Sequence, residues 1–116
     1  GYQMLNVSDI LRVFTDSIIL AQLNISDSYG YAINKVISEQ SDSFFELKEA
    51  TLYTSFRRLE ESHFITSYWG DENSGARRRY YSITEKGKEY LEENKDDWKK
   101  IKSILEKVLN TNQEEH

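Results

Sequence analysis

The chain has 116 residues, a formal net charge of −5 and no cysteine. This length fits one domain with a single core, and the lack of cysteine excludes a disulfide framework. No apolar run approaches the roughly 20 residues that a helix needs to cross a bilayer, so no membrane span or membrane partner is expected. No basic and apolar signal segment opens the chain, which favours a cytoplasmic location. Residues 1–3 precede Met4 and look like a cloning remnant, so the fold prediction starts at Met4.

The first predicted helix covers residues 8–23 and has apolar side chains around most of its circumference. Such a helix needs cover on more than one side. Its side chains divide into two rows, the first with Leu11, Phe14, Ile18 and Ala21 and the second with Ile10, Val13, Ser17 and Leu20. Because the chain is short, we expect the second row to contact another subunit.

Two further helices are predicted at residues 29–40 and 49–61, with a small strand between them at Phe44–Leu47. In the third helix, Leu52, Phe56 and Leu59 mark a buried row. At 100° per residue the opposite face is polar at its start and cationic further along. That outer face carries Ala50, Thr51, Tyr53, Thr54, Arg57 and Arg58.

A β-hairpin is predicted from Phe64 to Thr84, where two runs rich in Ile, Thr, Tyr and Trp flank an Asn-Ser-Gly turn. Three consecutive arginines, Arg77 to Arg79, follow this turn in a chain that is acidic overall. Alternation along a strand places Arg77 and Arg79 on one face and Arg78 on the other. Arg77 has the best reach, and one of the other two is a candidate to pair with Asp71 or Glu72.

A long charged helix is predicted to follow, with Thr84 as its cap and Glu85 at its positive end. Its apolar residues form a narrow stripe that is typical of an association seam. The stripe consists of Leu91, Trp98 and Leu105, seven residues apart, joined by Ile101, Ile104 and Val108. We expect this helix to mediate dimerisation and the tail beyond it to fray.

The order of three helices and a hairpin predicts a winged helix-turn-helix at residues 4–83, with an added C-terminal dimerisation helix and tail at 84–116. The fold class is mainly α (α+β). The start of a recognition helix enters the major groove of double-stranded DNA, where short polar groups approach base edges and arginines meet phosphate. We therefore expect base contacts from Thr51, Tyr53 and Thr54, and phosphate contacts from Arg57, Arg58 and the wing residues Arg77, Arg78 and Arg79.

Three strings, in the order "YGYAI", "EATLYTSFRRLEESHFI" and "SYWGDENSGARRRYYSITEKGKEYL", resemble the PadR family of bacterial transcriptional regulators, and the resemblance runs from Leu11 to Leu109. The length resembles the short subfamily of LmrR-like multidrug-binding repressors. The resemblance implies a homodimer in which the C-terminal helix packs against the N-terminal helix of the partner. It also implies repression of an operator, controlling an efflux transporter or a stress-response operon, and relief by an aromatic ligand. Lys48 replaces a small capping residue of the family and is a candidate phosphate contact.

In the multidrug-binding relatives, a tryptophan of the C-terminal helix and its symmetry mate sandwich planar aromatic molecules, and Trp98 falls at that place. Lys95 and Lys102 stand where these relatives have an aromatic and an acidic residue, which argues against cationic ligands. The alternative role for Trp98 is plain packing in a dimer core. The full candidate ligand set is Trp98, Ile10, Val13, Asp16, Ser17, Leu20, Lys95, Ile101 and Lys102.

An enzyme is not expected, because the sequence has no cysteine nucleophile, no glycine-rich phosphate loop and no metal-spaced set of histidines. His63 lies between a predicted helix and the wing, and His116 is terminal. No cofactor or metal is expected either. The remaining alternatives are a winged-helix interaction module that does not bind DNA and a PadR regulator without a drug-binding pore.

Overall fold

The structure is a computed structural model that describes residues 5–70 and 77–111. Within these residues the chain forms α1 (Val7–Ile25), α2 (Gly30–Gln40), α3 (Glu49–Glu61), β1 (Ile65–Trp69), β2 (Arg79–Ile83) and α4 (Glu85–Leu109). The two strands pair antiparallel. This is the predicted mainly α winged helix-turn-helix with an added C-terminal helix. No helix in the described ranges is long and apolar enough to cross a membrane.

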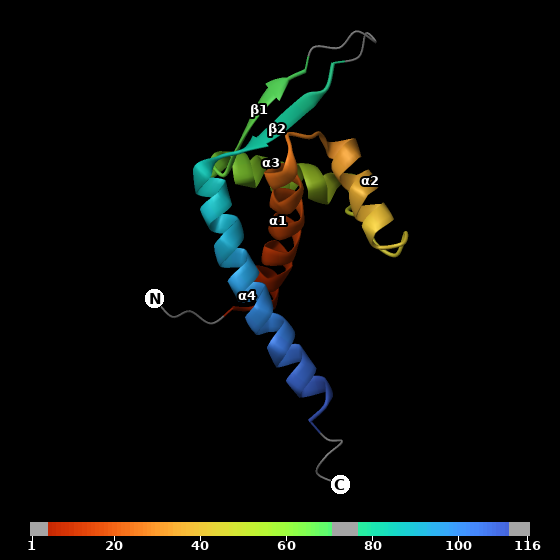
Figure 1. Ribbon diagram of the computed structural model, residues 1–116, viewed down its shortest axis with the longest axis vertical. Coiled ribbons are helices and arrows are strands. Elements are labelled where there is room, and N and C mark those ends of the chain that lie inside the picture. The colour runs from red at the N-terminus through yellow and green to blue at the C-terminus, as the bar shows by residue number, and fades with distance from the viewer. Residues whose placement is uncertain (1–4, 71–76, 112–116) are drawn as a thin grey trace.

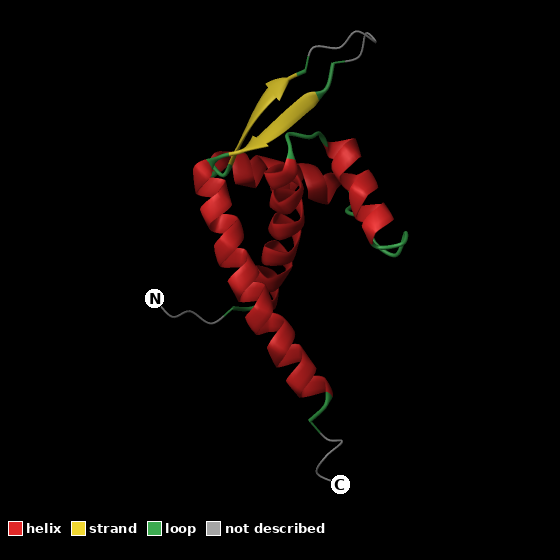
Figure 2. Cartoon of the chain, in the orientation of Figure 1, coloured by secondary structure: helices red, strands yellow, loops and turns green. Residues whose placement is uncertain are grey.

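Helices α1 and α4 pack along each other, and the last turns of α4 continue beyond the start of α1 (Figure 1). Helix α3 lies across the other end of α1, below the hairpin, and α2 lies on the far side of α1 from α4. Figure 2 shows that the two-stranded sheet projects from this end of the helical body. The recognition helix and the wing are therefore neighbours, while the end of α4 is remote from both.

The starts of α1 and α4 are set by side-chain caps. Asn6 Oδ1 accepts a hydrogen bond from the Asp9 backbone at 2.8 Å, and Asp9 Oδ2 accepts one from the Asn6 backbone at 3.3 Å, which is a capping box. Thr84 caps α4 as predicted, since its Oγ1 accepts from the Gly87 N–H at 3.0 Å. A Cβ at Gly87 would lie 2.1 Å from the carbonyl oxygen of Phe64, so only glycine lets α4 start this close to the segment before β1.

One hydrophobic core joins the helices to the sheet. Phe56 of α3 stacks on Tyr81 of β2 with a centroid distance of 3.9 Å and an interplanar angle of 13°. Both side chains are buried, together with Ile19, Leu20, Leu23, Ile33, Ile37, Leu47, Leu52, Leu59, Ile65 and Leu91. The predicted buried row of α3 is thus confirmed, and the wing is attached to the recognition helix by aromatic packing.

The segment before α2 contributes an unpredicted third position to the sheet. Ser28 exchanges two backbone hydrogen bonds with Tyr81, at 3.2 Å and 2.8 Å, and forms an isolated bridge. Tyr68, on β1, donates its hydroxyl to Asp27 Oδ2 at 2.6 Å. The wing is therefore held to the turn between α1 and α2 as well as to α3.

The predicted strand at Phe44–Leu47 is wrong, because this segment is irregular. Its backbone is satisfied by a side chain instead of by a neighbouring strand: Asn34 Nδ2 donates to the Leu47 carbonyl at 2.7 Å, and the Leu47 N–H donates to Asn34 Oδ1 at 2.9 Å. Leu47 and Phe45 point inward, while Phe44 is 93% exposed.

The expected division of α1 into an inner and a partner-facing row also needs correction. Val13 and Leu20, assigned to the partner-facing row, are buried within the single chain because α4 and the core cover them. Leu11, assigned to the inner row, is 62% exposed. The uncovered apolar surface of α1 thus includes Leu11 and Val7 and excludes Val13 and Leu20.

Several predictions fall outside the described residues. These are the remnant at residues 1–3, the Asn-Ser-Gly turn, the pairing of an arginine with Asp71 or Glu72, and the tail from residue 112 onward.

Candidate nucleic-acid interface

The outer face of α3 is polar and exposed, as predicted. Thr51, Tyr53, Thr54 and Arg57 are all exposed, whereas Leu52 and Phe56 on the same helix are buried. Lys48 occupies the N-cap position without a capping hydrogen bond from its side chain, and it too is exposed. A row of hydroxyl groups followed by a cation therefore lies open to an approaching partner.

Arg58 is placed differently from its neighbour Arg57. Its Nη2 donates to Asp16 Oδ1 of α1 and forms an ion pair with this carboxylate, and the Arg58 side chain is only partly exposed. The sequence placed both arginines on one outer face. The structure separates them, because Arg58 faces the buried Asp16 whereas Arg57 faces solvent.

The three wing arginines follow the predicted alternation along the strand. Arg77 and Arg79 lie over the ring of Trp69, with their guanidinium carbons 4.9 Å and 5.7 Å from its centroid. Arg78 lies over Tyr29, on the opposite side, at 4.9 Å. Guanidinium groups attract the face of an aromatic ring, so the rings orient these cations. All three arginines are exposed.

Arg79 is also tied to the recognition helix. Its Nη2 donates to Ser67 Oγ at 2.7 Å and lies 3.7 Å from Glu60 Oε2, and Ser67 Oγ donates to the same Glu60 oxygen at 2.7 Å. Because Glu60 belongs to α3, these contacts fix the wing relative to the recognition helix. An exposed ion pair of this kind adds little stability but limits where Arg79 can reach.

The predicted ligand residues divide into two groups. Trp98 is 40% exposed and tilts against Phe14 of α1 with a centroid distance of 6.0 Å, and Phe14 in turn contacts Phe45 edge-on at 5.4 Å. Lys95 and Lys102 are exposed beside Trp98 on α4, and Lys95 Nζ lies 3.1 Å from Glu92 Oε2. These residues, together with the half-buried Ile10 and Ile101, border one surface.

The second group lies in the interior of the single chain. Val13, Leu20 and Asp16 are buried, and the Ser17 Oγ is buried without a hydrogen-bond partner in the structure. Asp16 is not available to a ligand here, because both of its carboxylate oxygens accept hydrogen bonds from other side chains. A pore lined by all the predicted residues would need α1 and α4 to move apart.

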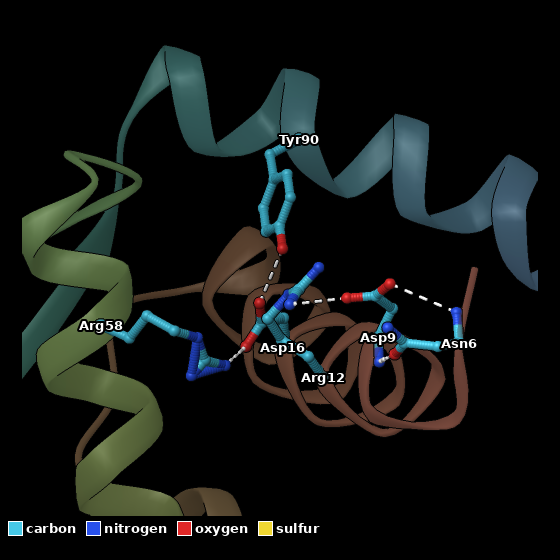
Figure 3. Close-up of polar contacts among 6 residues, drawn as sticks. All are labelled: Asn6, Asp9, Arg12, Asp16, Arg58 and Tyr90. Carbon is cyan, nitrogen blue, oxygen red and sulfur yellow. Dashed lines mark hydrogen bonds and ion pairs between the residues drawn. The ribbon is translucent and has the colours of Figure 1, made fainter. Parts of the chain in front are cut away.

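Sequence reasoning missed Tyr90. Its hydroxyl donates to Asp16 Oδ2 at 2.7 Å, as Figure 3 shows, and its ring stacks on Phe64 with a centroid distance of 4.1 Å. Burial raises the pKa of Asp16 above its ordinary value, and the bonds from Tyr90 and Arg58 offset this only in part. Burial, and secondarily the Asp16 carboxylate, raise the pKa of Tyr90. No local pattern signals a contact between residues so far apart in sequence.

The described residues contain no group of three or more His, Cys, Asp or Glu side chains that could hold a metal ion. His63 has a positive φ of 65° at the end of α3 and is exposed. It therefore serves as a helix-terminating residue in this structure.

Comparisons with known proteins agree with this architecture. The model of the transcriptional regulator PadR-like family matches residues 19–93. A protein from Lysinibacillus sphaericus, described as uncharacterized, is 46% identical over 99 residues, which is 85% of this chain and 91% of the relative. A transcriptional regulator from Clostridium thermocellum is 41% identical with a TM-score of 0.77, covering 85% of this chain and 96% of that one. A PadR family transcription regulator from Clostridium difficile R20291 is 39% identical with a TM-score of 0.69, covering 83% and 98%.

Proposed function

Because the chain belongs to the PadR-like family of transcriptional regulators, we propose that it binds operator DNA as a homodimer and represses transcription until a small molecule releases it. One observation carries the DNA-binding part of this proposal. In a protein of net charge −5, the exposed polar face of α3 adjoins a wing that bears three exposed arginines. Local cations can act on phosphate because salt screens the distant acidic groups beyond about 8 Å.

The contacts divide by chemistry. Thr51, Tyr53 and Thr54 are the candidates for base edges in the major groove, since they are exposed near the start of α3. Lys48 and Arg57, at the start and on the outer face of α3, are candidates for phosphate. The wing arginines would reach the flanking backbone or the minor groove. Arg58 is better suited to holding α3 in place, because it is engaged by Asp16.

An exposed apolar seam supports the homodimer. The last turns of α4 carry Ile104, Leu105, Val108 and Leu109, all more than half exposed, and Leu105 is 53% exposed. Helix α1 adds Leu11 at the opposite edge of the helical pair. Apolar side chains repeated along a charged helix favour packing against a second helix, and a second copy of this chain offers the same seam.

Trp98 supports the ligand part of the proposal, because it lies on this seam with its ring 40% exposed. Planar aromatic molecules would stack on it or on its symmetry mate. Lys95 and Lys102 flank it on the same face of α4, and they would favour neutral or anionic compounds over cationic ones. The controlled gene, an efflux transporter or a stress-response operon, is proposed from the family resemblance alone.

The test is fluorescence anisotropy of the protein on DNA from upstream of its own gene, measured over a range of salt concentrations. We expect affinity to fall steeply with salt, because phosphate contacts release counterions. Arg77→Ala with Arg79→Ala should weaken binding about tenfold or more and lower the salt slope by roughly two contacts.

The matched control removes two cations from α4 instead, with Lys100→Ala and Lys107→Ala. This pair makes the same change in net charge but lies on the exposed part of α4, away from the wing. Equal losses in the two double variants would show that only net charge matters. Binding without any salt dependence would rule out the DNA-binding function and favour a winged-helix module that binds protein.

A further inference from the structure

The carboxylate of Asp16 joins three helices. Asp16 lies on α1, its Oδ1 accepts from Arg58 of α3, and its Oδ2 accepts from the Tyr90 hydroxyl of α4 at 2.7 Å. Figure 3 shows the carboxylate between the two donors, with the recognition helix on one side and α4 on the other. The two donors bind different oxygens, so neither replaces the other.

The burial of this group makes both contacts necessary. Asp16 is 1% exposed, and a buried carboxylate is costly unless it is paired and hydrogen-bonded. Loss of either donor leaves one oxygen without a partner in the interior. The positions of α3 and α4 are therefore linked energetically through Asp16, although the two helices are far apart in sequence.

Neighbouring contacts make the linkage directional. The Tyr90 ring stacks on Phe64, just after the end of α3, with an interplanar angle of 6°. On α1, Arg12 is one turn before Asp16 and pairs with Asp9 at 3.1 Å. Tyr90 is therefore held in position by its ring as well as by its hydroxyl, and a shift of α4 must be transmitted to Asp16.

We propose that Asp16 is a positioning residue through which α4 controls the placement of the recognition helix. Tyr90 anchors the carboxylate to α4, and the carboxylate holds Arg58 and with it the C-terminal half of α3. A ligand or a dimer rearrangement that displaces α4 withdraws the Tyr90 hydroxyl, weakens the hold on Arg58 and lowers affinity for DNA. This inference rests on the proposed function, because it describes how the seam at Trp98 acts on the DNA-binding face.

The test is a double-mutant cycle on operator affinity with Tyr90→Phe, Arg58→Gln and the combination. Tyr90→Phe removes only the hydroxyl and keeps the ring on Phe64. We expect each single variant to weaken binding about five- to tenfold and the combination to be much weaker in effect than the product of the two losses, because both act through one carboxylate. Losses that multiply, or Tyr90→Phe with wild-type affinity, would overturn the proposal.

Tighter binding by Tyr90→Phe would also overturn it, since that result would mean that a released Arg58 contacts phosphate directly. The matched control is Tyr31→Phe, which removes an exposed hydroxyl from α2 and should leave affinity unchanged. All affinities are compared at a temperature at which circular dichroism shows every variant to be folded.

A second readout does not depend on DNA binding. Amide hydrogen exchange in Tyr90→Phe should become about fivefold faster at residues 56–61 of α3, while exchange in α2 stays as in the wild type. Uniform acceleration throughout the chain, or no change in α3, would reduce Tyr90 to a general packing residue. If the wild type does not bind DNA at all, the proposed function fails, and the exchange measurement still decides whether Asp16 links α4 to α3.

Discussion

The hydroxyl of Tyr53 lies against Gly30, so closely that a Cβ at residue 30 would be 2.7 Å from the hydroxyl oxygen and 3.1 Å from the Cζ of the ring. Tyr53 is on the outer face of α3, and its ring contacts Phe56 edge-on at 5.5 Å. The absence of a side chain at the start of α2 therefore sets the position of one candidate base-reading residue.

Gly30→Ala should displace Tyr53 and weaken operator binding about five- to tenfold. Overpacking should also cost about 1–3 kcal/mol of stability, although alanine is otherwise the better helix former. Fluorescence anisotropy and urea denaturation measure the two effects. The control is the same change in a Tyr53→Phe background, where the hydroxyl is gone and both penalties of Gly30→Ala should shrink. An equal penalty in both backgrounds would contradict the proposed clash.

Local patterns predicted most of the fold and the exposed face of α3. The bounds of α3, Glu49–Glu61, match the prediction because its apolar row has a regular helical period. The alternation of Arg77, Arg78 and Arg79 was equally accessible, since it depends only on the geometry of one strand.

Contacts between distant segments were not predictable in the same way. Tyr90 and Asp16 are 74 residues apart, and periodicity contains no information about which polar side chains meet across helices. The strand predicted at Phe44–Leu47 failed for a related reason, because Asn34 satisfies the backbone of Leu47. In both cases a side chain from another element decided the outcome.

His63→Gly should stabilise the protein. His63 has φ 65°, and its N–H donates to the Glu60 carbonyl at 3.0 Å while the Phe64 N–H donates to that of Leu59 at 2.9 Å. These bonds form a Schellman motif, in which glycine is preferred at the left-handed position. We expect a gain of about 1 kcal/mol in urea denaturation. Ser62→Gly, one residue earlier at φ −87°, is the control and should not stabilise the protein.

The wing arginines should contribute unequally to DNA binding. Arg77→Ala should weaken binding about threefold to tenfold and lower the salt slope by roughly one, without loss of stability. Arg79→Ala should reduce both affinity and stability, because it also removes the contacts to Ser67 and Glu60. Parallel salt titrations and thermal melts separate the two effects. Identical behaviour of the two variants would show that the contacts of Arg79 do not distinguish it.

Asp16→Asn should change how stability depends on pH. Burial raises the pKa of Asp16 in the folded protein, so the folded state binds a proton more tightly than the unfolded state. The stability from this group is fully present below the unfolded value of about 3.9 and is lost as pH rises through the folded pKa. Urea denaturation between pH 4 and pH 7 should therefore show the wild type losing stability relative to Asp16→Asn. The opposite trend would mean that Arg58 holds the pKa low.

Trp98 should respond directly to planar aromatic compounds. The chain has two tryptophans, so a Trp69→Phe background leaves Trp98 as the sole tryptophan fluorophore. In this background we expect saturable quenching by an aromatic carboxylate and weaker quenching by a cationic dye of similar size, because Lys95 and Lys102 lie beside the ring. Lys102→Glu should narrow or reverse this preference, whereas Lys86→Glu, at the other end of α4, should leave it unchanged. If Trp98 is not quenched by either compound, its contact with Phe14 is packing, and the ligand must bind elsewhere.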